Sequence, residues 1–136
     1  MNVQIKPPFS LESAKEKVQR AEDLWNTKNP EAISKAYTSN SEWRNRNVFL
    51  KGRSEIKAFL KAKWEKERNY RLEKHLFSFS DEHIAVHFQY EYQDENSQWF
   101  RAYGNEHWTF DTEGLMAKRD ASINDQAIDK NERIIF

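Results

Sequence analysis

The chain has 136 residues, with 22 Lys and Arg against 22 Asp and Glu, so its formal net charge is zero. This length fits one domain over residues 1–136, and the lack of a basic segment argues against a nucleic-acid-binding protein. The absence of cysteine excludes disulfides, thiol nucleophiles and cysteine-ligated zinc, and no apolar run reaches the length of a membrane span. We therefore expect a soluble, cytoplasmic protein without a membrane partner.

Three helices are expected in the first half of the chain. Ser10 is a good N-cap for the first, because apolar residues recur at helical spacing directly after it. Pro30 suits the first position of the second. The third carries Trp64 on its apolar face. The expected segments are helices following Ser10 to residue 27, at 30–38 and within 51–69, with a short extended segment at 41–47.

From residue 70 the apolar period changes from 3.6 to 2, which is typical of strands. The expected strands cover residues 70–80, 83–93, 99–110 and 115–125, joined by the turn-forming sequences SDEH, DENS and DTEG. Helices followed by a meander of strands indicate an α+β fold, with three N-terminal helices packed on one face of a curved antiparallel sheet. Residues 126–136 are expected to be a loose tail or to dock on a neighbouring molecule.

Several motifs resemble the small bacterial DUF1348 family of the NTF2-like (SnoaL-like) superfamily. They include PPF at 7–9, WRNR at 43–46, FLKGR at 49–53, YRLEKHLF at 70–77 and QWFRAYGNEHWTFD at 98–111. The resemblance implies a cone-shaped fold whose sheet wraps around a pocket, and a homodimer formed through the outer face of the sheet. It implies no activity, because NTF2-like proteins include isomerases, dehydratases, cyclases and non-catalytic binders.

Turn chemistry predicts which strand residues share the helix-covered face. A three-residue DTEG loop places Glu106 opposite Asp120 and Ala102 opposite Asn124. A two-residue turn after Ser80 turns Arg71 towards the same face.

The polar members of that face form the candidate site. When two carboxyl groups face each other under helices, ionising both costs a large free energy, so one of them should keep its proton. Glu106 and Asp120 are therefore the expected acid–base pair. Asn45 and Asn124 could orient a substrate oxygen, and Arg71 could bind a substrate carboxylate. Aromatic rings would complete the pocket. These further ligand-binding candidates are Trp43, Trp64 and Trp108.

Two alternatives stay open. Glu106 beside an arginine could be a structural ion pair rather than a catalyst. A register slip of one residue would exchange the two faces. The pocket would then present Trp99, Arg101, Tyr103, Asn105, His107, Arg119 and Asp125.

No metal site or cofactor is expected. His83 and His87 are four residues apart, but on a strand that spacing separates them by about 13 Å. No phosphate loop or dinucleotide fingerprint occurs. The partner we expect is therefore a small organic ligand.

Two functions fit these features. One is a cofactor-independent isomerase or dehydratase, and the other is a non-catalytic ligand-binding or dimeric interaction module. A solvent-open cavity of about 300 Å³ or more above Glu106 would favour the enzyme. An interior plugged by Trp43, Trp64 and Trp108 would favour the module.

Overall fold

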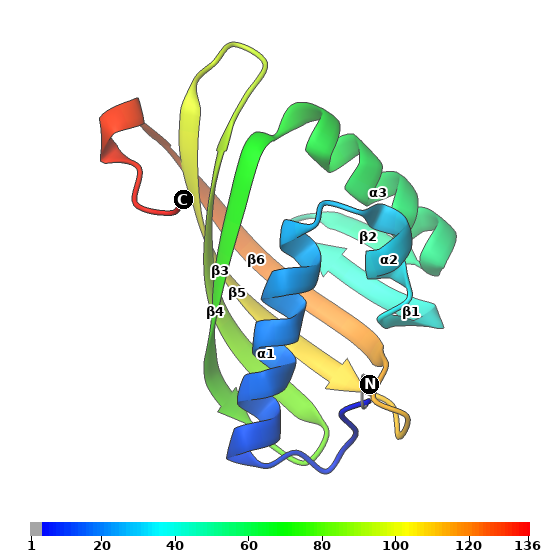
Figure 1. Cartoon of the computed structure of the whole chain (residues 1–136). Coiled ribbons are helices and arrows are strands. Elements are labelled where there is room, and N and C mark those ends of the chain that lie inside the picture. Colours follow the sequence, from blue (N-terminus) through cyan, green and yellow to red (C-terminus); the bar gives the residue numbers. More distant parts are fainter. Residues whose placement is uncertain (1–3) are drawn as a thin grey trace.

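The computed structural model describes residues 4–136 (Figure 1). Residues 1–3, which the single-domain prediction includes, lie outside this part. The elements in chain order are α1 (Leu11–Asn26), α2 (Pro30–Ser34), β1 (Tyr37–Asn45), β2 (Val48–Lys51), α3 (Arg53–Lys66), β3 (Arg68–Phe79), β4 (His83–Gln93), β5 (Trp99–Phe110), β6 (Met116–Ile128) and the 3₁₀ turn η1 (Lys130–Glu132).

Local side-chain caps set the starts of the first two helices. Ser10 accepts a hydrogen bond from the Ser13 backbone N–H at 3.1 Å, and the Ser13 hydroxyl accepts one from the Ser10 N–H at 2.9 Å. Asn29 accepts from the Ala32 N–H at 3.1 Å at the start of α2. The expected helices are present, but α2 ends at Ser34, since Tyr37 already begins β1.

The strands form one sheet in the order β2-β1-β6-β5-β4-β3. Strands β3 to β6 form the expected antiparallel meander, whereas β1 lies parallel to β6. The α+β class is confirmed, with a mixed rather than a wholly antiparallel sheet. Figure 1 shows α1 lying across the concave face of the curved sheet and α3 covering the end near β1 and β2.

The core lies between this concave face and the helices. Strand β4 directs Ile84, Val86, Phe88 and Tyr90 inward, each at most 3% exposed. Gly104 on β5 lies directly opposite Phe88, and a Cβ built on it would come within 2.1 Å of the Phe88 ring. A glycine is needed here because the Phe88 ring takes the space of its side chain.

The expected register between β5 and β6 is wrong by one residue. Phe110 pairs with Met116 as the DTEG turn predicts, but Thr109 pairs with Lys118, so a bulge takes up one residue. Glu106 therefore lies opposite Ala121, and Ala102 opposite Asp125.

Because side chains alternate along a strand, the bulge turns the rest of β6 over. Asp120 and Asn124, both expected in the pocket, lie on the outer face and are exposed. Arg119 takes the inward position and is 4% exposed.

The predicted inward face of β3 is wrong, because a second bulge shifts its pairing with β4. The two-residue turn is present, since the Ser80 N–H donates to the His83 carbonyl at 2.9 Å. The pairing then shifts between Leu76 and Ser78. Arg71, expected in the pocket, is consequently exposed on the outer face, and Lys74 points inward at 7% exposure.

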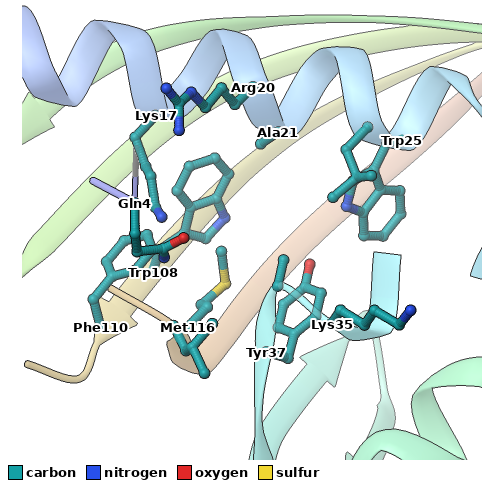
Figure 2. A pocket seen from close by; sticks show the side chains of 13 residues that line it. Gln4, Lys17, Arg20, Ala21, Trp25, Lys35, Tyr37, Trp108, Phe110 and Met116 are labelled. Atoms are coloured by element: carbon teal, nitrogen blue, oxygen red, sulfur yellow. The ribbon is translucent and has the colours of Figure 1, made fainter. Parts of the chain in front are cut away.

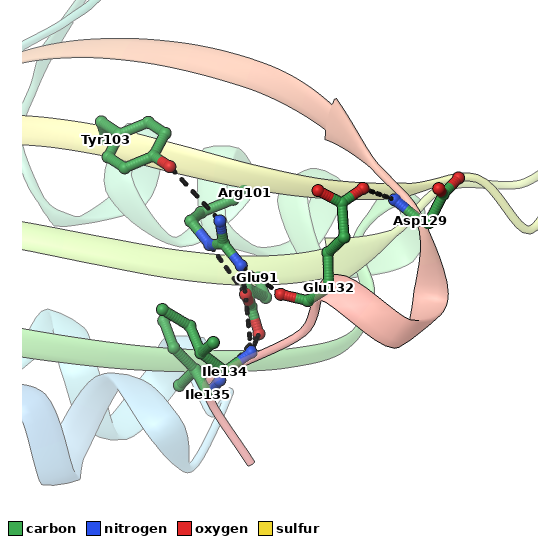
Figure 3. Close-up of polar contacts among 7 residues, drawn as sticks. All are labelled: Glu91, Arg101, Tyr103, Asp129, Glu132, Ile134 and Ile135. Carbon is green, nitrogen blue, oxygen red and sulfur yellow. Dashed lines mark hydrogen bonds and ion pairs between the residues drawn. The ribbon is translucent and has the colours of Figure 1, made fainter.

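The C-terminal residues pack on the chain's own sheet rather than hanging loose (Figure 3). The Glu91 carboxylate accepts hydrogen bonds from the backbone N–H groups of Ile134 at 3.2 Å and Ile135 at 2.9 Å. Arg101 bonds both Glu91 at 2.8 Å and the Glu132 carbonyl at 2.6 Å. The tail thus covers the Glu91 end of the outer sheet face.

Candidate functional site

A buried ionic cluster lies where the catalytic pair was expected. Lys74 from β3 contacts one oxygen of Glu106 on β5. Arg119 from β6 binds the other oxygen through Nε at 2.5 Å and also donates to Asn45 Oδ1 on β1 at 3.0 Å. We call Lys74, Glu106, Arg119 and Asn45 the ionic core. Four strands contribute to it, so the curvature of the sheet brings it together.

Aromatic faces surround the two cations of the ionic core. The Lys74 amine lies 4.6 Å from the Phe88 ring centroid and 5.5 Å from that of Trp108. The Arg119 guanidinium lies 4.6 Å from the Trp43 centroid. Ring faces carry partial negative charge, and they stabilise the positive charge in excess over one carboxylate. Part of the aromatic content of the chain therefore packs against the two cations of the ionic core.

The electrostatics keep Glu106 ionised. Burial alone would raise the pKa of its carboxyl group, but Arg119 and Lys74 outweigh burial and lower that pKa to about 2. Burial lowers the pKa of Lys74, with Glu106 opposing it. Both Glu106 oxygens are occupied by cations, so this carboxylate holds no proton to donate. The arrangement is a satisfied buried ion pair, the structural alternative considered from the sequence.

The interior leaves almost no room for a ligand. The cavity beside Lys74, Arg119 and Asn45 has a volume of about 10 Å³, roughly that needed for one water molecule. Aromatic rings pack closely in this interior: the Trp43 ring centroid lies 5.8 Å from that of Trp25 in a stacked pair, and the Trp25 centroid lies 5.8 Å from that of Trp64 in an edge-to-face pair. The interior is therefore closed, and the open pocket of about 420 Å³ whose lining includes Glu106 is formed mainly by outer-face residues such as Arg44, His107 and Asp120.

The structure brings together half of the expected site residues around the ionic core. Glu106, Trp43, Asn45 and Trp108 are inward and buried. Trp64 on α3 is partly buried against Trp25 and Tyr70.

The other three expected residues are elsewhere. Asp120 is bonded to Arg44 on the outer face at 2.5 Å, and Asn124 and Arg71 are exposed. The expected Glu106–Asp120 pair is therefore wrong.

An open pocket lined in part by Trp108 lies between α1, the start of β1 and the β5–β6 hairpin (Figure 2). We call it the α1 pocket; its volume is about 180 Å³. Its lining consists of Gln4, Lys17, Arg20, Ala21, Leu24, Trp25, Lys35, Ala36, Tyr37, Trp108, Phe110, Leu115 and Met116.

Lys17 is the partly buried amine of this pocket. Its Nζ donates to the Gly114 carbonyl at 2.8 Å and the Ile5 carbonyl at 3.4 Å, and lies 5.2 Å from the Phe110 ring centroid. Burial and the neighbouring Arg20 lower the pKa of Lys17 to about 8. Among the described residues, no carboxylate lies within ion-pair distance of this amine.

Two further residues that line the α1 pocket carry hydrogen-bond donors. Tyr37 is 2% exposed, and burial raises the pKa of its hydroxyl, which therefore stays protonated. Trp108 Nε1 is buried and has no hydrogen-bond partner among the described residues. A buried N–H without an acceptor is costly, by about 1–3 kcal/mol.

Sequence reasoning missed Lys17 and Lys74, and it placed Arg119 in the pocket only under the alternative register. For Arg119, the polar alternation along β6 indicates the inward position. Residues Lys118, Asp120, Ser122 and Asn124 form an unbroken polar row, which marks the solvent face and leaves Arg119 inward. Nothing local distinguishes Lys17 from Lys15, the other lysine of α1, since the environment of Lys17 comes from the distant hairpin.

Within residues 4–136, no group of three or more His, Asp or Glu side chains is arranged to hold a metal ion. The helices of that part are also too short or too polar to cross a membrane.

Comparison with known proteins identifies the family but no activity. Three solved structures of the same fold are similar over most of their length. The epoxide hydrolase/cyclase-like enzyme SalBIII, described in pyran ring formation in the polyether salinomycin, has a TM-score of 0.73 at 18% identity, covering 83% of this chain and 92% of the other. An NTF2-like protein of unknown function from Burkholderia pseudomallei has a TM-score of 0.73 at 15% identity, covering 82% and 90%. RV0760c from Mycobacterium tuberculosis, in complex with estradiol-17beta-hemisuccinate, has a TM-score of 0.69 at 13% identity, covering 82% and 93%.

At these identities the similarities show the fold alone. A search of curated proteins finds no match. The family described as "Protein of unknown function (DUF1348)" matches residues 7–136. The chain therefore has the NTF2-like fold and belongs to the DUF1348 family.

Proposed function

We propose that this protein binds a small organic molecule carrying an acceptor oxygen, in the α1 pocket and without acid–base chemistry at Glu106. The observation that carries the proposal is the contrast between a sealed ionic core and an open pocket lined by donors and cations. Of the two functions weighed from the sequence, this favours the ligand-binding module over the isomerase or dehydratase.

Pocket volume limits the size of the ligand. An engineered cavity of about 150 Å³ in another protein binds benzene, and the α1 pocket offers about 180 Å³. The ligand is therefore the size of a single ring with a short substituent. Larger ligands would have to extend through the mouth of the pocket.

The chemistry of the lining favours a negatively charged or carbonyl-bearing ligand. Lys17, Arg20 and Lys35 line the pocket, and its lining contains no Asp or Glu. Tyr37 and Trp108 add neutral donors. An anionic oxygen gains more from such donors than a neutral one, since charge-assisted hydrogen bonds are about twice as strong. The complex of RV0760c with estradiol-17beta-hemisuccinate supports small-molecule binding by this fold.

The proposal is tested by titration calorimetry with three single-ring probes: benzoate, benzamide and benzylamine. We expect benzoate to bind most tightly and benzylamine most weakly. Equal or tighter binding of benzylamine would contradict the proposed charge preference.

A matched pair of helix variants tests the location. Ala21→Phe fills the α1 pocket, whereas Ala58→Phe places the same ring on an exposed position of α3. Benzoate affinity should fall at least about tenfold in the first variant and stay unchanged in the second. Unchanged affinity in Ala21→Phe would place the ligand elsewhere.

We further propose that the outer sheet face mediates a homodimer. The exposed rings of Phe77 and Tyr103, 68% and 38% exposed, support an interface on the part of this face that the tail leaves open. Replacing Tyr103 by Glu should shift the molar mass measured by light scattering from dimer to monomer. A monomeric wild-type protein at micromolar concentration would contradict this proposal.

A further inference from the structure

The amine of Lys17 occupies an unusual position for a lysine. It lies in the wall of a pocket, partly buried, and its hydrogen-bond partners are backbone carbonyls. Other buried lysines of this chain have a carboxylate instead: Lys74 contacts Glu106, and Lys63 contacts Glu67 at 2.8 Å. Lys17 is thus an amine held in place without a counter-charge in contact.

The two backbone carbonyls occupy two positions around the Lys17 nitrogen. A neutral primary amine has two N–H bonds and one lone pair. The carbonyls of Gly114 and Ile5 accept both N–H bonds, which leaves the lone pair as the remaining position on the nitrogen. Figure 2 shows the side chain running from α1 towards Gln4 at the wall of the pocket.

Burial and a neighbouring cation favour the neutral form of the Lys17 amine. Arg20 on α1 and Lys35 after α2 line the same pocket, and Asp111 in the β5–β6 turn opposes them. Burial and Arg20 outweigh Asp111 and lower the pKa of Lys17 to about 8. A lysine becomes a nucleophile when desolvation or a neighbouring cation removes its proton.

We propose that Lys17 captures the carbonyl group of a ring-sized aldehyde or ketone bound in the α1 pocket, as a reversible imine. This inference rests on the proposed function and narrows its ligand class to carbonyl compounds.

The step balances without an oxidant or reductant. The Lys17 lone pair attacks the carbonyl carbon, a C–N bond forms, and the C=O π electrons move to oxygen, which takes a proton from solvent. The nitrogen loses one proton to solvent, a second proton from solvent turns the new hydroxyl into a leaving water, and the nitrogen lone pair forms the C=N bond of a protonated imine. Hydrolysis by the reverse path releases the ligand.

The test is reductive trapping with benzaldehyde and sodium cyanoborohydride at pH 8, followed by peptide mapping by mass spectrometry. Lys15 is the internal control, because it is exposed on the same helix. At pH 8 about half of an amine with a pKa of about 8 is unprotonated, against about 0.3% for a lysine with the ordinary pKa of 10.5. We expect Lys17 to be modified at least about tenfold faster than Lys15.

The Ala21→Phe variant separates capture in the pocket from general amine reactivity. Filling the pocket should slow trapping at Lys17 at least about fivefold and leave Lys15 unchanged. Lys17→Arg should remove this modified peptide and leave the rate of trapping at Lys15 unchanged.

The outcomes distinguish the two proposals. If benzoate binds in the α1 pocket but Lys17 is trapped no faster than Lys15, the imine is wrong and the binding function stands. If benzoate does not bind and Lys17 is not preferentially trapped, the binding function itself is contradicted, and the imine with it.

Discussion

Two lysines, Lys74 and Lys17, lie in contrasting surroundings. Lys74 contacts Glu106 in an interior whose free volume is about 10 Å³. Lys17 is bonded to backbone carbonyls at the wall of a cavity of about 180 Å³. A carboxylate partner and close packing make the first lysine structural. The absence of both leaves the second able to meet a ligand.

The two regions share a wall, so they are not independent. The Trp108 ring lies 5.5 Å from the Lys74 amine and also lines the α1 pocket. Trp25 likewise lines both cavities. A ligand in the α1 pocket would therefore contact rings that the ionic core holds in place. A substitution that destabilises the ionic core should therefore weaken ligand binding in the α1 pocket.

Removing the carboxylate of the ionic core should have the largest effect. Glu106→Gln leaves Lys74 and Arg119 buried without a counter-charge, and breaking such a pair costs about 3–5 kcal/mol. Urea unfolding should show this loss of stability. The control is Glu113→Gln, which removes an exposed partner of Lys6 at 3.5 Å and should change stability by less than about 1 kcal/mol. Equal effects in the two variants would show that Glu106 is not the centre of a buried cluster.

Lowering the pH should cause part of the loss of stability expected for Glu106→Gln. The pKa of Glu106 is lowered from 4.5 to about 2 in the folded protein. Its contribution to stability is complete above pH 4.5 and is lost as the pH falls towards 2, because the unfolded state then binds the proton more tightly. The loss is on the order of 3 kcal/mol. Unfolding free energies measured between pH 5 and 2 should fall more steeply for wild type than for Glu106→Gln.

Gly104→Ala tests how completely the interior is filled. The new Cβ would lie 2.1 Å from the Phe88 ring, and such overpacking typically costs about 1–3 kcal/mol. The ring cannot move freely, since it is 3% exposed and packs on Lys74. Thermal unfolding should show the loss, and adding Phe88→Leu should recover part of it. A neutral Gly104→Ala variant would mean that the interior has spare room.

The smallest effect should come from Lys17 at alkaline pH. Its folded pKa of about 8 lies below the ordinary 10.5, so the penalty for its buried charge is present below pH 8 and relieved as the pH rises from 8 to 10.5. After a discount for solvent screening of this partly exposed group, the gain is about 1 kcal/mol. Lys17→Met should lack this gain when unfolding is compared at pH 7.5 and 10. An identical pH response in both proteins would show that Lys17 is not desolvated.

Period and turn chemistry predicted the fold well and the site only in part. Helix starts, the four long strands and the inward row on β4 and β5 follow from local sequence. The predicted faces of β3 and β6 were wrong because a turn fixes the register only up to the first bulge. On β6, the polar row from Lys118 to Asn124 determines the solvent face, against the register counted from the turn. On β3, the buried residues Tyr70 and Leu72 likewise determine the inward face.

The α1 pocket could not be predicted, because its walls come from parts of the chain far apart in sequence. Lys17 meets Ile5, Phe110 and Gly114 only in the folded protein. Parallel pairing of β1 with β6 places Tyr37 beside Met116. Local hydrophobic periodicity in the sequence does not indicate contacts between such distant residues.

The most direct measurement follows the tryptophan indole N–H signals by ¹⁵N NMR during a benzoate titration. The described residues leave the indole N–H groups of Trp43, Trp64 and Trp108 without acceptors, but of these only Trp108 lines the α1 pocket. Single Trp→Phe variants assign the three signals. The predicted result is a saturable shift of the Trp108 signal that exceeds those of Trp43 and Trp64. A larger shift of Trp43 or Trp64 would place the ligand in the interior and contradict the division between a sealed core and an open pocket.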